Sequence, residues 1–259
     1  MKDFYFKNTN GVITLHCKAL DDAGFTKHCF TTKTGGVSTG YLAQTNLSFS
    51  RECESNVKEN YARVMAASGI DAKSVVLTNQ EHTDIVKVFD GDTTEQFIKS
   101  ETAVDGFVTN KEGVCLAAFT ADCVPVIIAD PVKRAVACIH SGWRGTAKKI
   151  TKNAVELMSK TYGCNPADMV AAIGPCISKC CYEVGQDVFD GFGAPEYFTK
   201  KPDGKYMLDL VFANEQVLKE AGIKNIYASN ECTFCKSDLY YSHRATKGKR
   251  GNMAALIQI

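Results

Sequence analysis

The chain has 259 residues, of which 45% are hydrophobic and 23% charged, so it can bury a large core as an ordinary globular protein. Thirty basic residues against twenty-nine acidic ones leave a net charge of +1, which excludes a strong attraction to nucleic acid or to an anionic membrane surface. The first residues lack the apolar core of a signal peptide, and no later stretch reaches the roughly 18 apolar residues of a membrane span. We therefore expect a cytoplasmic protein that binds neither nucleic acid nor membrane.

Short β-rich runs predict strands along the chain, beginning near residues 12, 28, 74, 85, 105, 114, 124 and 135. Three amphipathic segments, 57–68, 146–160 and 209–221, predict helices, and a glycine stands shortly after each of them. The connections around residues 85–128 are too short to carry a helix each, which favours antiparallel pairing there. No repeat or proline-rich linker marks a boundary, so the sequence predicts an α/β fold: a single domain, residues 1–259, of mixed β-sheets flanked by helices.

Three side chains of metal-binding type stand at the ends of apolar runs. They are His82 in NQEHTDIV, Cys123 in FTADCVPVIIAD and His140 in AVACIHSGWRG. Imidazole and thiolate are ligands that zinc prefers, and a catalytic zinc site has three protein ligands and leaves the fourth position to water. The spacing is too long for a zinc finger, so the fold would have to bring separate strand ends together. The alternative is that each is a packed residue at a strand end.

The same residues allow a different chemistry, in which Cys123 is a nucleophile and His140 or His82 is its base. One histidine beside the thiol suffices for such a dyad. Two histidines beside it indicate a metal site instead.

Two glycine-containing turns carry cations that could hold an anion such as phosphate. Arg144 lies in the segment 142–145, which leads into the predicted helix at 146, so a guanidinium lies near a helix N-terminus. Lys33 lies in TTKTGGVS, which lacks the spacing of a nucleotide P-loop. The simpler interpretations are a tight strand-to-helix connection and an ordinary turn.

Twelve cysteines in a long chain without an export signal indicate reduced thiols rather than a disulfide framework. Cys232 and Cys235 form a CxxC, and together with Cys176, Cys180 and Cys181 they suggest a second metal site. The sequence has no matching CxxC, so we favour buried thiols as the interpretation of these five residues.

Several of these strings together resemble one family, the laccase-domain purine nucleoside phosphorylases, also labelled polyphenol oxidase or peptidoglycan editing factor. The match extends over nearly the whole chain, and its most specific parts contain Cys123 and His140. In order, the strings are GGVS at Gly35, NL at Asn46, VKEN at Val57, QEH at Gln80, DGFVT at Asp105, TADCVPV at Thr120, HSGWRG at His140, IGPCI at Ile173, YEVG at Tyr182 and ECTFC at Glu231.

The resemblance implies an α/β fold of mixed sheets and a zinc ion bound by His82, Cys123 and His140. It also implies phosphorolysis of adenosine, inosine and methylthioadenosine to the free base and ribose 1-phosphate or its methylthio analogue, together with deamination of adenosine. The partners would then be a purine nucleoside and phosphate. The oligomeric state remains open.

Beyond the metal ligands, we assign a catalytic role to Asp122, a carboxylate beside Cys123 that could transfer protons during deamination, with Asp84 as a second candidate. The candidate substrate-binding residues are Arg144, Lys33, Asn46 and Asn60. The family usually has arginine at the positions of Lys33 and Tyr61, and Lys33 lacks the bidentate fork of an arginine. We therefore expect Arg144 to be the main phosphate anchor.

The family label laccase does not fit the residues present. A multicopper oxidase needs a copper site with two histidines and a cysteine as well as an imidazole-rich copper cluster, and five histidines cannot supply both. Copper-linked polyphenol oxidation would require copper to replace zinc at the one site. A Cys–His amidase that edits peptidoglycan precursors and a metal-binding protein without turnover also stay open as functions of these residues.

Overall fold

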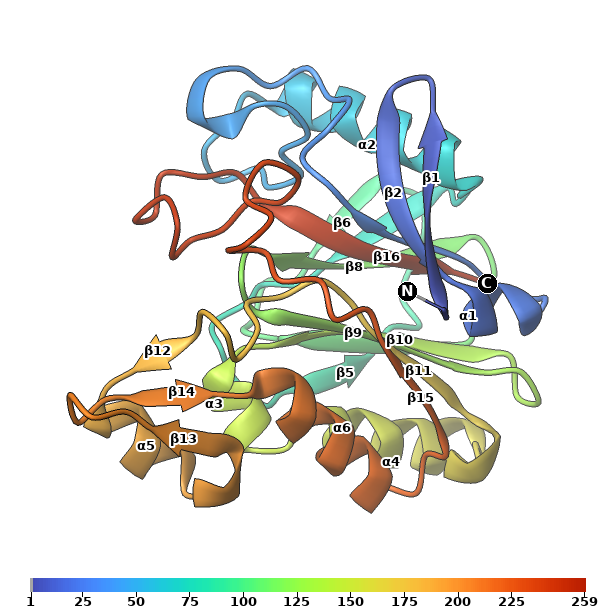
Figure 1. Cartoon of the computed structure of the whole chain (residues 1–259). Helices are drawn as coiled ribbons and strands as arrows, with labels where there is room; N and C mark the ends of the chain where they lie inside the picture. The colour runs from blue at the N-terminus through green and yellow to red at the C-terminus, as the bar shows by residue number, and fades with distance from the viewer. Residues whose placement is uncertain (1) are drawn as a thin grey trace.

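The computed structural model describes residues 2–259, and two β-sheets packed face to face form its centre (Figure 1). The strands are β1 (Phe4–Thr9), β2 (Val12–Cys17), β3 (Lys27–Thr31), β4 (Ser74–Leu77), β5 (Val86–Val88), β6 (Phe97–Lys99), β7 (Gly106–Thr109), β8 (Val114–Thr120), β9 (Val124–Asp130), β10 (Ala135–Ser141), β11 (Val170–Ile173), β12 (Glu183–Val184), β13 (Phe198–Lys200), β14 (Tyr206–Leu208), β15 (Asn225–Ala228) and β16 (Met253–Gln258). The α-helices are α1 (Lys18–Asp22), α2 (Glu54–Ser68), α3 (Trp143–Ala147), α4 (Ile150–Tyr162), α5 (Gln186–Phe192) and α6 (Leu210–Glu220).

The two large sheets each mix parallel and antiparallel pairs. One has seven strands in the order β1-β2-β3-β16-β8-β4-β6, and the other has six in the order β15-β11-β9-β10-β7-β5. β10 pairs antiparallel with β9 and β7, whereas β4–β8 and β5–β7 are parallel pairs. A small third sheet, β12-β14-β13, lies beside α5 at one corner of the molecule (Figure 1).

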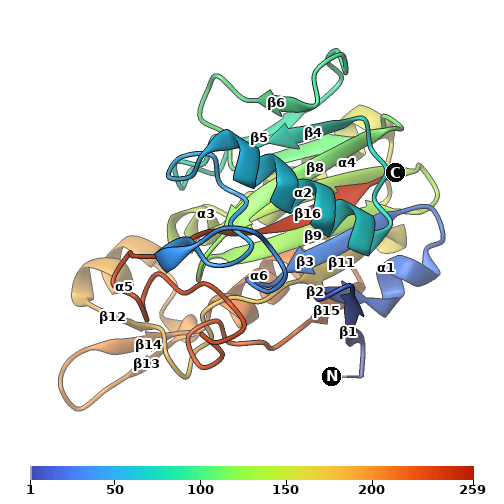
Figure 2. The same cartoon turned by 90° about the horizontal axis from the view of Figure 1, so that it is seen from above.

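Alternate side chains of the central strands point to opposite faces of each sheet and pack into different cores. In β8, Leu116 and Ala118 belong to the core between the sheets, whereas Cys115 and Ala117 pack in the core that contains α2. Figure 2 shows α2 lying across the outer face of the seven-stranded sheet. Helix α4 contributes Ile150 to the core on the outer face of the other sheet. The layers are therefore helix, sheet, sheet and helix, and the predicted α/β fold of mixed sheets flanked by helices is confirmed.

All eight strand positions expected from the sequence are occupied by strands. The helix predicted at 209–221 is α6, whose N-cap Asp209 accepts a hydrogen bond from the Phe212 N–H at 3.0 Å. The helix predicted at 57–68 begins one turn earlier, at Glu54. None of the helices in the described residues is long and apolar enough to cross a membrane.

The helix predicted at 146–160 is wrong as a single element. The structure has two helices there, α3 and α4, separated at Lys149, whose φ of 60° is left-handed. Thr146 in α3 is tied to Ser141 and Asn214 by its hydroxyl, whereas α4 packs under the sheet. The buried apolar residues Ile150, Ala154 and Met158 all lie in α4, whereas α3 buries Gly145 and Thr146.

The antiparallel pairing expected around residues 85–128 holds only in part. β4, β6 and β8 belong to the seven-stranded sheet, whereas β5, β7 and β9 belong to the six-stranded sheet. The chain therefore crosses between the sheets at each of these connections. The crossing between β4 and β5 and the crossing between β8 and β9 form the end of the molecule where the three metal-binding side chains meet.

Candidate metal centre

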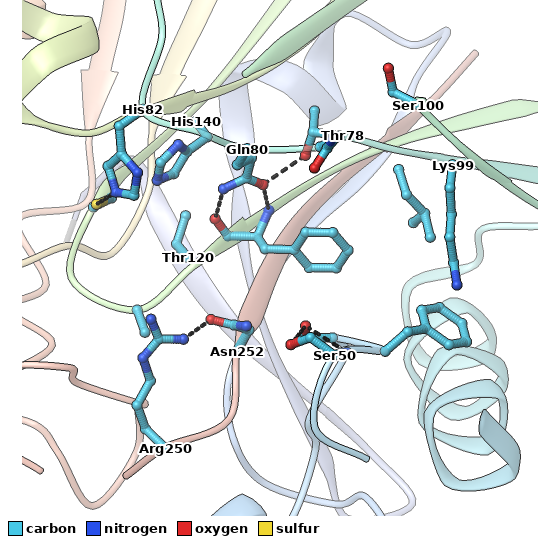
Figure 3. A pocket seen from close by; sticks show the side chains of 17 residues that line it. Ser50, Thr78, Gln80, His82, Lys99, Ser100, Thr120, His140, Arg250 and Asn252 are labelled. Atoms are coloured by element: carbon cyan, nitrogen blue, oxygen red, sulfur yellow. Dashed lines mark hydrogen bonds between the residues drawn. The ribbon is translucent and has the colours of Figure 1, made fainter. Parts of the chain in front are cut away.

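His82, Cys123 and His140 come together at the end of the paired sheets. His82 lies in the β4–β5 connection, Cys123 in the turn between β8 and β9, and His140 near the end of β10. One ligand atom from each lies within 4.8 Å of the other two, and the Cys123 Sγ is 3.8 Å from the His82 Nε2. The two imidazole rings stand edge to face with their centroids 4.9 Å apart, at one end of a pocket (Figure 3). Two imidazoles and one thiol in this arrangement can hold a single metal ion.

The backbone turns sharply at two of the ligands, and no side chain fits at the glycine that follows the third. His82 and Asp122 have left-handed φ angles of 59° and 91°, so both ligand-bearing turns are sharp. Gly142 follows the third ligand, and a Cβ at that position would lie 2.8 Å from the His82 ring and 3.3 Å from the Cys123 sulfur. The glycine is therefore required for the ligands to approach one another.

Asp105 supports the site, although its sequence context alone indicated no such role. Its carboxylate is fully buried and lies 2.7 Å from the His140 Nδ1. It also accepts hydrogen bonds from the backbone N–H of His82 at 3.1 Å and of Thr83 at 2.8 Å. A carboxylate on Nδ1 fixes the imidazole tautomer and leaves Nε2 free as a metal ligand. The one feature of the sequence that could have indicated this role is the string DGFVT, in which a lone acidic residue precedes a buried strand.

The charges of these groups favour a thiolate in the metal-free protein. Burial raises the pKa of Cys123, but His140 and His82 outweigh it and lower that pKa to about 6. Burial lowers the pKa of His140, yet the Cys123 thiolate and Asp105 raise it to about 9. At neutral pH the pair is therefore a thiolate beside an imidazolium, and the thiolate is the form that binds metals.

A pocket of about 560 Å³ opens beside the three ligands (Figure 3). This volume lies in the range of small-molecule sites, roughly 300 to 1,000 Å³. Gln80 fixes one wall, because its amide accepts from the Phe119 N–H at 2.7 Å and donates to the Phe119 carbonyl at 2.8 Å. The lining residues are Ser48, Phe49, Ser50, Leu77, Thr78, Asn79, Gln80, His82, Lys99, Ser100, Phe119, Thr120, Ala121, Cys123, His140, Arg250 and Asn252.

Neither cation chosen from the sequence lines this pocket. Arg144 is exposed and lies within α3, where its guanidinium stacks over the Trp143 ring at 4.3 Å. The Lys33 ammonium donates a hydrogen bond to the backbone carbonyl of Ser237. It thereby holds in place the C-terminal loop, residues 229–252, between β15 and β16. Because neither side chain lines the pocket, the expectation that these two bind phosphate stays a prediction. The arginine and the lysine that do line the pocket are Arg250 and Lys99.

The two candidate asparagines support loops. Asn60 is fully buried, accepts from the Val37 N–H at 2.8 Å and donates to the Ser38 hydroxyl at 2.9 Å. Asn46 accepts from the Asn252 N–H at 2.9 Å. Neither asparagine lines the larger pocket, although Asn252, which Asn46 contacts, does.

Tyr61 is part of the hydrophobic core. Its ring is 1% exposed and packs edge to face with Phe97 at 5.0 Å and in a stack with Phe49 at 6.2 Å. A residue at this position faces the core beneath α2, so the absence of an arginine here removes no anchor from the pocket.

The carboxylates proposed as proton carriers have other partners. Asp122 accepts from the Thr233 hydroxyl at 2.6 Å and from the Arg244 N–H at 2.7 Å, which ties the C-terminal loop to the turn that carries Cys123. Asp84 lies 3.7 Å from the Lys148 ammonium. Neither residue lines the pocket, and the catalytic role expected for Asp122 stays a prediction.

The interpretation of the remaining cysteines as buried thiols holds for Cys176 and Cys232, but Cys181 is only partly buried and the prediction is wrong for Cys180 and Cys235. Cys180 and Cys235 are exposed, and their thiols cluster with those of Cys181 and Cys232. The sequence spacing could not show this, because the two pairs come from loops far apart in the chain.

Comparison with known proteins agrees with this fold. A family model described as multi-copper polyphenol oxidoreductase laccase matches residues 27–259. The purine nucleoside phosphorylase YlmD of Geobacillus stearothermophilus is 35% identical over 270 residues, covering 99% of this chain and 97% of that protein. The protein of the same name from Bacillus subtilis is 34% identical over 240 residues, covering 88% and 86%. A crystal structure of the Bacillus licheniformis hypothetical protein YfiH matches with a TM-score of 0.87 at 33% identity and covers 98% of both chains. The chain therefore belongs to the laccase-domain family, several of whose members are named purine nucleoside phosphorylase.

Proposed function

We propose that this protein is a zinc-dependent purine nucleoside phosphorylase. The observation that carries the proposal is the pairing of the three-ligand cluster with a pocket large enough for a nucleoside. The donor set of two imidazoles and one thiol fits zinc, and Asp105 orients one of the imidazoles as a ligand. Relatives named purine nucleoside phosphorylase support the choice of substrates. Adenosine, inosine and methylthioadenosine are the substrates to test.

A second, smaller pocket of about 170 Å³ adjoins the first and fits phosphate. It shares Arg250 with the larger pocket and adds Arg51. Burial lowers the pKa of Arg250, and its buried Nε has no hydrogen-bond partner among the described residues. A half-buried cation whose buried Nε donor is unused favours a bound anion. None of the described residues that line either pocket is an aspartate or a glutamate, so no carboxylate there repels phosphate.

In phosphorolysis, a phosphate oxygen forms a bond to C1′ of the ribose while the bond from C1′ to N9 of the purine breaks. Arg250 and Arg51 would hold the phosphate next to the larger pocket, which is the positioning that this reaction needs. Phe49 and Phe119 offer apolar surfaces to the purine. When bound, zinc supplies a Lewis acid that polarises substrate atoms and lowers the pKa of water. Asp105 and Gly142 keep the three ligands in place.

Adenosine deamination is the second activity that we propose, and the same donor set supports it, because three ligands leave a position open to water. The absence of a carboxylate among the described lining residues favours phosphorolysis as the faster reaction. A Cys–His amidase needs only one histidine beside Cys123, and here two lie beside it. Copper at the same three ligands would instead support a polyphenol oxidase.

The test combines metal analysis with product chromatography. The purified chain is incubated with adenosine or inosine, with and without inorganic phosphate, and zinc is measured by mass spectrometry. We expect zinc, together with free base and ribose 1-phosphate that form only when phosphate is present. Cys123→Ser serves as the control for contaminating activity. A zinc-loaded wild-type protein that releases no base would refute the proposal, as would amide cleavage by metal-free protein or phenol oxidation that requires copper.

A further inference from the structure

Four thiols outside the site described above form a second cluster. Cys180 and Cys181 lie in the loop between β11 and β12, and Cys232 and Cys235 lie in the loop between β15 and β16. All four sulfurs lie within 4.8 Å of one another. The Sγ of Cys181 is 3.3 Å from that of Cys235 and 3.5 Å from that of Cys180, and the Cys180 and Cys235 sulfurs are 3.7 Å apart.

These distances fit four ligands around one ion. With zinc–sulfur bonds of roughly 2.3 Å, the corners of a regular tetrahedron lie about 3.8 Å apart. Three of the sulfur–sulfur separations, 3.3 to 3.7 Å, are close to that value, and the others are no longer than 4.8 Å. A disulfide would bring two sulfurs to about 2.05 Å, and a four-iron cluster would hold them further apart because the cluster itself lies between them. The spacing therefore favours a single tetrahedral metal ion.

The backbone also prepares the sulfurs as ligands. The N–H of Ser178 donates to the Cys232 Sγ at 3.5 Å, and the Lys236 N–H closes the CxxC turn on the Cys232 carbonyl at 3.0 Å. An N–H aimed at sulfur stabilises the thiolate form, which is the form that binds zinc. Cys180 and Cys235 are exposed, so the cluster is not explained as a packed apolar core.

The cluster also joins two loops, one of which is long and has no regular secondary structure. The described residues 229–252 contain no helix or strand, and a connection of that length is uncommon within a compact domain unless something holds it. The loop lies beside the β11–β12 loop, since Cys176 donates its N–H to the Glu231 carbonyl at 3.1 Å and accepts from the Thr233 N–H at 3.0 Å (Figure 1). Further along, the same loop carries Arg250 into the pocket.

We propose that Cys180, Cys181, Cys232 and Cys235 bind a structural zinc ion. Four protein ligands close the site, so the ion stabilises the two loops and takes no part in turnover. The proposal does not depend on the activity proposed for the other site.

The test is the zinc content of the full chain and of matched variants. Wild type should contain two zinc ions per chain. Cys181→Ser and Cys235→Ser should each lose one ion and keep the other, whereas Cys123→Ser should lose only the ion of the three-ligand site. Cys53→Ser is the control, because Cys53 is an exposed cysteine outside both clusters. The proposal is wrong if Cys181→Ser and Cys235→Ser contain as much zinc as wild type, or if the lost metal is iron.

A second measurement on wild type keeps the proposal testable if the variants do not fold. A thiol-alkylating reagent is added to the native, zinc-replete protein, and the modified cysteines are mapped by mass spectrometry. Coordinated Cys180 and Cys235 should react at least tenfold more slowly than Cys53, and removal of zinc with a strong chelator should abolish that difference. Equal reaction of the three exposed cysteines before zinc removal would overturn the proposal, as would a disulfide among the four.

Discussion

The two cysteine-containing clusters of this protein differ in what holds their ligands. His140 lies in a fully buried strand, and Asp105, itself buried, fixes its ring. The four clustered thiols lie on loops and are fixed mainly by one another and by a few backbone hydrogen bonds. A site built on strand ends keeps its geometry when the metal leaves, whereas a site built on loops supplies part of the order of those loops. We therefore expect metal loss to remove activity at the first cluster and stability at the second.

The largest effect should follow from Cys123→Ser. A serine hydroxyl is a poor zinc ligand near neutral pH, so nucleoside turnover should fall to the detection limit. Circular dichroism and the thermal midpoint should change little, because the strands that carry the site are buried. Full activity with a full zinc complement would contradict the role given to this residue.

Chelation should separate the two clusters in time. The three-ligand site has an open position, so a chelator should strip it first and inactivate the enzyme while the thermal midpoint stays constant. Loss of the second ion should follow more slowly and lower the midpoint. Activity and thermal unfolding are measured along one time course, with zinc added back at the end. Simultaneous loss of activity and fold would show that the first site is structural.

Asp105→Asn tests the rigidity of the strand-held site. The substitution removes the negative charge beside His140 and offers an amide N–H₂ where backbone N–H groups now donate. Loss of such an outer partner typically costs about 10- to 100-fold in metal affinity. Zinc affinity is measured by competition with a coloured chelator, and circular dichroism reports folding. Unchanged affinity in a folded variant would show that Asp105 does not orient His140.

Alanine variants of two arginines, compared for their effect on phosphorolysis, show where the phosphate binds. Arg250→Ala should raise KM for phosphate and lower phosphorolysis by about ten- to a hundredfold, the effect of losing a contact of about 1.5 to 3 kcal/mol. Arg144→Ala is the matched control, because that side chain is exposed and lies outside the pocket. Deamination should be affected much less by either change. If Arg144→Ala causes the larger loss, phosphate binds at α3, as the sequence alone led us to expect.

The smallest effect should come from Lys33→Met, which removes the ammonium that donates to the Ser237 carbonyl. Loss of one hydrogen bond from a half-buried group costs about 1 kcal/mol, equivalent to roughly 2 to 4 °C in the thermal midpoint of a chain this long. KM for phosphate should stay the same, since Lys33 supports the loop and does not line the pocket. A large rise in KM would restore Lys33 as a substrate ligand.

Much of the fold was predictable because burial leaves a local pattern. β9 and β10 are buried at every position and appear in the sequence as continuous apolar runs, and α6 has a recognisable cap at Asp209. The break at Lys149 was not predictable, because its left-handed φ of 60° occurs at a lysine, a residue that does not by itself indicate the end of a helix. The metal-binding residue types at His82, Cys123 and His140 were also visible in the sequence, since their chemistry does not depend on the fold.

Tertiary structure alone decided which residues support or complete the sites. Asp105 reaches His140 across the register of β7 and β10, and Arg250 reaches the pocket from a loop without regular structure. The same holds for the thiols, where Cys181 and Cys235 lie 3.3 Å apart although 54 positions separate them. Composition and periodicity report whether a residue is buried, but not which distant residue lies beside it. The sequence by itself therefore determined the strands and the ligand types, and the pairing of strands across two sheets decided which side chains meet.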